Sequence, residues 1–128
     1  MEIIRRSFHT DLRLIKEFRD TSLTLLKAYG ISEDNLFKIR LILDELISNS
    51  YKHGNNKDFS KIIEVSIEID DNYCMIRVRD EGKGINFDRK KDVFSEHGRG
   101  LHIVDFISDK MLVDNNIITA FVSLKSNL

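Results

Sequence analysis

The chain has 128 residues, and 20 Lys and Arg against 21 Asp and Glu leave a formal net charge of -1, so it lacks the overall basic field of proteins that bind nucleic acids or acidic membranes. Hydrophobic residues make up 41% of the sequence, which excludes a disordered chain, and the length predicts a single domain over residues 1–128. A lone cysteine, no signal-peptide core and no apolar run near the roughly 18 residues of a membrane span predict a cytoplasmic protein without membrane contact.

The hydrophobic pattern predicts strands and helices in the order β-α-α-β-β-α-β-β. Ser32 is the expected N-cap of the second helix. The expected elements are a strand at 2–8, helices at 11–28 and 33–52, strands at 63–69 and 73–80, a helix from about 98 to 108, and strands at 110–113 and 117–124. This order predicts an α+β fold with helices layered on one face of a mostly antiparallel sheet.

Two polar residues of the second helix lie away from its expected solvent face, which carries Arg40, Asp44 and Ser48. Glu45 and Asn49 share a stripe between the apolar neighbours Leu41 and Ile42. A buried polar group needs a partner, because leaving it unpaired costs about 1–3 kcal/mol. A metal ion or a phosphate would supply that partner. The alternative is a second hydrated strip, with Lys38 and Lys52 neutralising Glu45.

An aspartate closes the strand at 73–80. Alternation along that strand places Asp80 on the core-facing side with Ile76 and Val78. The loop that follows contains Gly82 and Gly84, which allow positive φ and a close approach of the backbone to a ligand. A plain turn capped by Asp80 is the alternative interpretation of the same residues.

A pair of glycines precedes the third helix. Gly98-Arg99-Gly100 stands immediately before the apolar residues that begin with Leu101. Free backbone amides and the positive end of the helix dipole favour an anion at such a terminus, and the Arg99 guanidinium suits phosphate oxygens. A flexible helix entry explains the pair equally well.

Together, the three patterns resemble the GHKL ATPases. The residues that carry the resemblance are Glu45-x-x-x-Asn49 with Lys52-His53-Gly54, then Asp80-x-Gly82-x-Gly84, then Gly98-x-Gly100. Within this superfamily the chain is similar to the small bacterial anti-sigma factor and serine-protein kinase group. The resemblance covers essentially the whole chain and implies the Bergerat fold, a two-layer α/β sandwich with a mixed, mostly antiparallel sheet and helices on one face.

The resemblance implies ATP and Mg²⁺ as cofactors and assigns roles to residues. Asn49 would ligate Mg²⁺, and Glu45 would act as the general base. Asp80 would accept a hydrogen bond from the adenine amino group. Arg99 would be catalytic by offsetting charge on the transferred phosphoryl group. The other nucleotide-binding positions that the resemblance implies are Lys52, His53, Gly82, Gly84, Ile85, Gly98, Arg99, Gly100, Leu101 and Thr119.

Two regions depart from the usual pattern of the group. Thr119 stands for the threonine of a Gly-Thr pair near adenine, and the glycine of that pair is missing. The lid, residues 85–97, is shorter than is usual. The basic residues Lys83, Lys90 and Lys91 in this region could attract phosphate, although a solvated loop is the simpler interpretation.

The function that the resemblance implies is an ATP-dependent serine-protein kinase that is also an anti-sigma factor. It would phosphorylate a STAS-type anti-anti-sigma partner and sequester a sigma factor. The alternatives are a non-catalytic ATP/ADP-binding partner switch and a detached histidine-kinase ATPase domain. A homodimer is a further expectation, with Arg13, Lys16 and Arg19 as one docking face, although an ordinary solvated helix face also explains these charges.

Overall fold

The structure is a computed structural model that describes residues 2–85, 87 and 96–125. Its elements are β1 (Glu2–His9), α1 (Leu12–Ala28), α2 (Glu33–Asn49), the short π-helix η1 (Ser50–Gly54), β2 (Ile62–Ile69), β3 (Tyr73–Arg79), α3 (Glu96–Ile107), β4 (Lys110–Asp114) and β5 (Ile117–Ser123). The predicted order of strands and α-helices is confirmed. In these ranges no helix combines the length and the apolar character that a membrane crossing requires.

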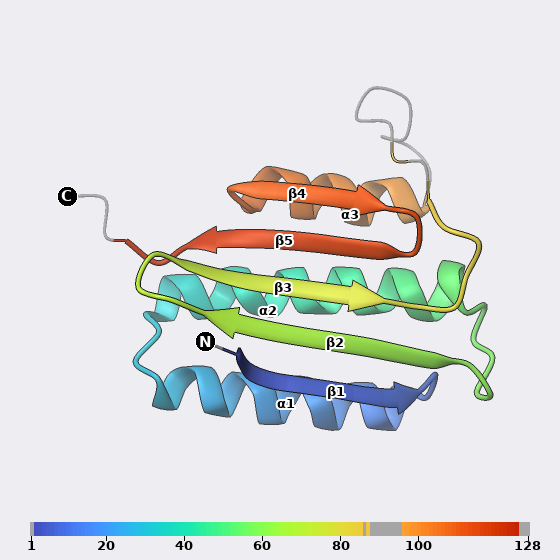
Figure 1. Cartoon of the computed structure of the whole chain (residues 1–128), viewed down its shortest axis with the longest axis horizontal. Coiled ribbons are helices and arrows are strands. Elements are labelled where there is room, and N and C mark those ends of the chain that lie inside the picture. The colour runs from blue at the N-terminus through green and yellow to red at the C-terminus, as the bar shows by residue number, and fades with distance from the viewer. Residues whose placement is uncertain (1, 86, 88–95, 126–128) are drawn as a thin grey trace.

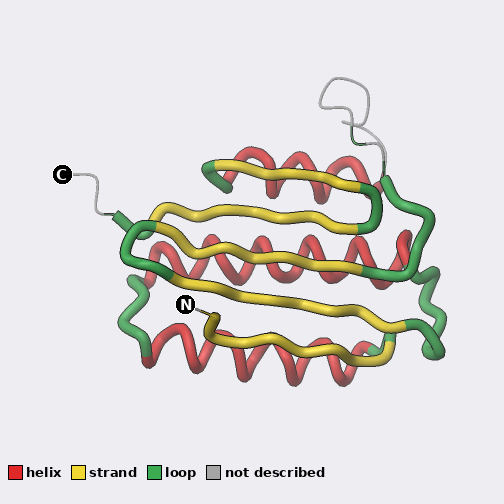
Figure 2. Tube along the Cα trace, in the orientation of Figure 1, coloured by secondary structure: helices red, strands yellow, loops and turns green. Residues whose placement is uncertain are grey.

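The described strands form one five-stranded sheet in the order β1-β2-β3-β5-β4. Every neighbouring pair in it is antiparallel, whereas a mixed sheet was expected. In Figure 1 the helices α1, α2 and α3 all lie behind the sheet, so its other face has no helix over it; Figure 2 shows the same two layers. The predicted α+β sandwich with helices on one face is therefore confirmed.

The core lies between α2 and the middle of the sheet. Alternate residues of β2 and β3 point into it, among them Ile63, Val65, Ile67, Cys74, Ile76 and Val78. The apolar residues of α2, Ile39, Ile42, Leu43, Leu46 and Ile47, are buried against them, and α2 also contacts α1 and α3. Close packing of this kind holds backbone and side chains in fixed positions. Functional groups at the ends of α2 and β3 are thus carried by the most buried elements.

The helix ends follow local sequence signals, with one exception. The Ser32 side chain accepts from the Asn35 N–H at 3.2 Å, which confirms the predicted N-cap of α2. Gly30, after α1, has a φ of 86°, which suits a glycine helix stop. The exception is the end of α2, which was expected near Lys52. The chain widens after Asn49 into η1, in which the Asn55 N–H bonds the Ser50 carbonyl at 2.7 Å. Such π turns occur often at functional sites.

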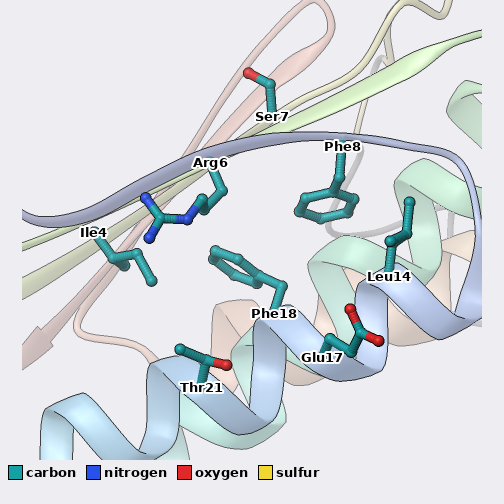
Figure 3. A pocket seen from close by; sticks show the side chains of 8 residues that line it. All are labelled: Ile4, Arg6, Ser7, Phe8, Leu14, Glu17, Phe18 and Thr21. Atoms are coloured by element: carbon teal, nitrogen blue, oxygen red, sulfur yellow. The ribbon is translucent and has the colours of Figure 1, made fainter.

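A pocket of about 320 Å³, called here the β1–α1 pocket, opens between the first strand and the first helix. Figure 3 shows Phe8 on the strand and Phe18 on the helix pointing toward each other, with Arg6 and Glu17 beside them. The two aromatic rings are 5.4 Å apart between centroids and tilted by 36°. The remaining lining residues are Ile4, Ser7, Leu14 and Thr21. The centre of this pocket is apolar, and its polar groups stand at the rim.

Candidate functional site

One end of the molecule gathers most of the predicted site residues. The C-terminal ends of α2 and β3, the beginning of α3 and the β4–β5 turn all meet there, at the right of Figure 1. A cavity of about 240 Å³, called here the Asp80 cavity, lies at this end. It is lined by His53, Gly54, Asn56, Lys61, Asp80, Glu81, Gly82, Lys83, Gly84 and Ile85. The structure therefore joins the segment after α2 to the loop after β3, as the sequence patterns predicted.

Asp80 is the buried polar group of this cavity, with 6% of its surface exposed. It continues the inward alternation of β3, which confirms its predicted orientation. Its Oδ1 accepts from the Gly82 N–H at 2.8 Å. The other carboxylate oxygen faces Gly54, where an added Cβ would lie only 2.1 Å from Oδ2. A side chain at position 54 would thus displace the carboxylate, a requirement that the motif Lys52-His53-Gly54 does not indicate by itself.

The two loop glycines serve different purposes. Gly84 has a φ of +95°, and an added Cβ would lie 3.0 Å from the Asn115 backbone. Of the two properties that these glycines allow, Gly84 uses positive φ, whereas Gly82 lies outside the left-handed region. A Cβ on Gly82 would lie 2.5 Å from the Gly54 carbonyl oxygen. A glycine is required at position 82 because the backbone of this loop approaches the backbone at Gly54 closely.

Glu45 and Asn49 lie on the inner side of α2. Asn49 is 5% exposed, and both its Oδ1 and its Nδ2 are buried without a hydrogen-bond partner in the described part of the chain. Glu45 is half-buried, and its carboxylate faces α3, where a Cβ on Gly100 would lie 2.6 Å from Oε2. The hydrated-strip alternative is therefore wrong for Asn49. A buried amide without partners is the condition that a bound ligand would relieve.

The opposite arc of α2 is less exposed than expected. Arg40 is exposed, but Asp44 and Ser48 are half-buried. Arg19 of α1 donates to Asp44 at 3.2 Å, and this hydrogen bond raises the pKa of the Arg19 guanidinium. Packing of α1 beside α2 turns the predicted solvent face into a contact between helices. Arg19, expected on a docking face with Arg13 and Lys16, is thus engaged within the chain.

The third helix differs from the expectation at its start. It begins at Glu96, so Gly98 lies in its first turn and Gly100 follows the four residues whose N–H groups have no intrahelical partner. Gly100 is therefore not a free-amide position; it leaves room for the Glu45 carboxylate. Arg99 is exposed. The Leu101 side chain is fully buried in the core, so its expected contact with a nucleotide stays a prediction that only its backbone could satisfy.

Two further predicted residues, Thr119 and Lys52, do not line the Asp80 cavity. Thr119 pairs with Arg77 across the sheet, between the inward-facing residues Ile118 and Ala120. It lies on the face opposite Asp80, because successive residues of a strand alternate between faces. Lys52 is exposed and lines another pocket, beside α1, not the Asp80 cavity. Of the two predicted positions Lys52 and His53, only His53 lines the cavity.

Two asparagines at this end are not among the predicted site residues. Asn55 is fully buried, and its side chain bonds the backbone of Glu81 and of Ile62. Asn116, in the β4–β5 turn, donates from Nδ2 to the Asp80 carbonyl. Their neighbours in sequence are typical of turns, and nothing local indicates that Glu81 and Asp80, which lie 26 and 36 positions away, are their partners.

The predictions on the lid fall largely outside the described residues. Residues 86 and 88–95, which include Lys90 and Lys91, lie outside the described part of the chain. Ile85 is half-buried and Lys83 is exposed, and both line the Asp80 cavity. Nothing further is assigned to the lid.

The residues at this end fit a magnesium–nucleotide complex. Within the described ranges no group of three or more His, Cys, Asp or Glu could hold a metal ion. A hard cation at the unpaired Asn49 oxygen would therefore share its coordination with phosphate oxygens and water, which is usual for Mg²⁺. The buried Asp80 offers an acceptor, and the positions where a Cβ would collide keep the surrounding backbone close.

Comparisons with known proteins agree with this geometry. The family model of the histidine kinase-like ATPase domain matches residues 8–120. The anti-sigma F factor of Geobacillus thermodenitrificans (strain NG80-2) is 30% identical over 92 residues, which cover 66% of this chain and 63% of that protein. The serine-protein kinase RsbW of Bacillus subtilis (strain 168) is 22% identical over 99 residues, covering 68% of this chain and 62% of that protein. The chain thus spans less than two thirds of these relatives.

A solved structure shows the same fold. The histidine kinase AdeS of Acinetobacter baumannii superposes with a TM-score of 0.50 and 18% sequence identity. The superposition covers 98% of this chain and 70% of the other. At this identity the likeness concerns the fold alone.

Proposed function

Because the chain belongs to the histidine kinase-like ATPase family, we propose that it binds Mg²⁺-ATP at this end of the molecule and transfers the γ-phosphate to a serine of a partner protein. The observation that carries the proposal is Asn49, whose two side-chain polar atoms are buried without partners in the described structure. Leaving them so costs about 1–3 kcal/mol, which a ligand would recover. The cavity with its buried Asp80 lies at the same end of the molecule.

Binding is assigned to residues as follows. Asp80 accepts a hydrogen bond from the adenine amino group, and Gly54 keeps its carboxylate in place. Asn49 offers its Oδ1 to the metal ion. When bound, Mg²⁺ supplies positive charge that neutralises the phosphate oxygens. Arg99 is exposed on α3 and adds a guanidinium that suits phosphate oxygens.

Glu45 is the proposed general base. Its half-buried carboxylate lies one helical turn before Asn49 and has room beside Gly100. A carboxylate there takes the proton of the attacking serine hydroxyl. General-base catalysis contributes about 10²- to 10⁴-fold to a rate, which sets the loss expected when the group is removed.

The proposed partners are a sigma factor and a STAS-type anti-anti-sigma protein. The names of two relatives, an anti-sigma F factor and a serine-protein kinase, support this assignment. Phosphorylation adds about -1.5 to -2 charges to a serine. This charge weakens the complex with the phosphorylated partner and leaves the kinase free to hold the sigma factor.

The test is phosphoryl transfer from radiolabelled Mg²⁺-ATP to a candidate STAS protein at saturating nucleotide. The wild-type chain is expected to label a serine, and Glu45→Ala to lower the rate by about 10²-fold or more. Glu17→Ala, which removes an exposed carboxylate at the β1–α1 pocket, is the matched control and is expected to label normally.

Two outcomes contradict the proposal at different levels. No labelled serine at saturating ATP would reject the kinase and favour a nucleotide-responsive partner switch. No binding of ATP to the wild-type chain would reject the nucleotide site as well.

A further inference from the structure

One peptide group, between Asp80 and Glu81, is held from both sides by asparagine side chains. The Asn55 Oδ1 accepts from the Glu81 N–H at 2.8 Å. The Asn116 Nδ2 donates to the Asp80 carbonyl. The two asparagines come from segments on either side of this loop in the sequence, the end of η1 and the β4–β5 turn. Both polar atoms of this single peptide group are thus occupied by side chains.

Asn55 is fixed in its orientation. It is fully buried, and its Nδ2 donates to the Thr10 Oγ1 at 2.9 Å and to the Ile62 carbonyl at 3.1 Å. The Ile62 carbonyl can only accept, and the Glu81 N–H can only donate, so the amide cannot be reversed. Both hydrogens of the amide nitrogen and its oxygen are in use. A buried network in which each group has a partner holds its members rigidly.

Asn116 holds Asp80 through its backbone as well. The Asp80 N–H donates to the Asn116 carbonyl at 3.1 Å, so both main-chain polar groups of Asp80 bond the same residue. The neighbouring Asn115 carbonyl accepts from the Ile85 N–H at 3.0 Å. The β4–β5 turn therefore grips the loop at its first residue and again at Ile85.

The direction of the Asp80 side chain depends on this peptide group. Rotation of the peptide changes ψ at Asp80 and φ at Glu81, and moves the loop that supplies the Gly82 N–H to the carboxylate. The carboxylate already lies against Gly54, where even one added carbon would collide with it. A shift of the peptide would therefore press it on Gly54 or withdraw it from the cavity.

We infer that Asn55 and Asn116 form a peptide clamp that positions Asp80 and sets the selectivity of the cavity for bases carrying an exocyclic amino donor. The inference rests on the proposed function. Neither asparagine is a catalytic residue; both act through Asp80. An ionised carboxylate only accepts hydrogen bonds, so a base with a carbonyl in place of the amino group meets an acceptor facing an acceptor. Discrimination between the two bases requires the carboxylate to be held in place.

The experiment compares the dissociation constants of ATP and ITP for the full chain and its variants. ITP has a carbonyl in place of the adenine amino group, and its neighbouring ring nitrogen carries a hydrogen where that of adenine accepts one. Asn55→Ala and Asn116→Ala each remove one side of the clamp. Both are expected to lower the wild-type preference for ATP by about three- to tenfold. Urea unfolding of the same proteins measures their stability.

Thr10→Val is the matched control. It removes the hydroxyl that accepts from Asn55 and donates to the Lys61 carbonyl at 2.8 Å, so it destabilises the same network but spares the bond to Glu81. It is expected to lower the unfolding midpoint and keep the wild-type ATP preference. Asn116→Ala carries the test if Asn55→Ala does not fold, because Asn116 is only half-buried.

Three outcomes overturn the inference. Folded clamp variants with an unchanged ATP preference would show that the asparagines only stabilise the fold. A loss of preference in Thr10→Val as large as in Asn55→Ala would attribute the effect to general loosening. If the wild-type chain binds no ATP, the proposed function fails and the inference fails with it, whereas the first two outcomes leave the proposed function standing.

Discussion

The β1–α1 pocket and the Asp80 cavity differ in the polarity of the groups at their centres, and this difference does not follow from their volumes. The first is larger, about 320 Å³ against about 240 Å³. Its centre is the contact between Phe8 and Phe18, and its charged groups stand at the rim. The second surrounds Asp80, a carboxylate with 6% of its surface exposed. Burying a polar group is costly unless it has partners, which makes Asp80 a candidate binding group. Buried polar chemistry, more than size, separates a binding site from a gap in packing.

The largest expected effect is a loss of stability on truncating a residue of the β1–α1 pocket, with no change in ATP affinity. Phe18 is 6% exposed, and its truncation to alanine removes the ring that faces Phe8. Phe18→Ala is expected to lower the free energy of unfolding by about 3–5 kcal/mol. Urea unfolding measures the loss, and titration with ATP below the unfolding midpoint is expected to give the wild-type affinity. A matching drop in affinity would break the distinction between the two regions.

The next effect concerns Glu45 and separates chemistry from binding. Gly100→Ala places a methyl group 2.6 Å from Oε2 of Glu45, so the carboxylate must move. A displacement of about 1 Å in a reacting group can cost about 100-fold in rate. We expect a fall of that order in serine phosphorylation. Stability should change by no more than about 1 kcal/mol, since alanine favours a helix. A wild-type rate of serine phosphorylation in Gly100→Ala would exclude Glu45 as the general base.

A comparison of two glycines tests the Asp80 cavity directly. Gly54→Ala would place a methyl group against the Asp80 carboxylate and is expected to weaken ATP binding by about tenfold or more, the value of one hydrogen bond to a charged group. The control is Gly30→Ala: nothing lies within 4 Å of its added carbon, but its φ of +86° strains any side chain. It is expected to cost about 1–2 kcal/mol of stability and to leave binding unchanged. Equal affinities for the two variants would contradict the model of the cavity.

The smallest expected effect concerns the buried thiol of Cys74 on β3, the strand that leads to Asp80. Cys74 shares the inward face of β3 with Asp80 and is fully buried, which raises the pKa of its thiol to about 12. A thiol in the unfolded chain titrates near 8.5, so between these values the unfolded state releases a proton that the folded state keeps. The free energy of unfolding should therefore fall as pH rises, by roughly 1 kcal/mol at about pH 9.5. Urea unfolding of wild type and Cys74→Ala measures the difference, which is expected only in wild type.

Local patterns predicted what depends on periodicity or on a single cap. The alternation along β3 predicted the inward orientation of Asp80, and Ser32 predicted the start of α2. The side of the sheet on which Thr119 lies could not be read in this way, because it depends on the register of β5 against β3. The depth of Leu101 depends on how α3 packs against α2, which its own sequence does not encode.

The π turn and the clamp were beyond local prediction for a related reason. The residues of η1 continue a helical pattern, so nothing local predicts the wider turn, after which Lys52 lies on the α1 side and His53 lines the cavity. Asn55 and Asn116 have the sequence context of turns, and their partners lie in other segments. Hydrogen bonds between distant segments are set by the tertiary fold. Asparagines that follow a helix or fill a hairpin beside a predicted ligand loop are therefore worth testing as clamps.

Because Asn116 comes late in the sequence, the Asp80 cavity is completed only when the β4–β5 turn has folded. A ribosome delivers Asp80 and its glycine loop well before the β4–β5 turn, and until that turn folds back the Asp80 peptide lacks its second asparagine. A chain that ends before this turn carries every residue that lines the cavity, but it lacks both Asn116 and β5, the strand that pairs with β3 inside the sheet. The proposed nucleotide, at 100 times its dissociation constant, would add about 2.7 kcal/mol to the stability of the complete fold alone.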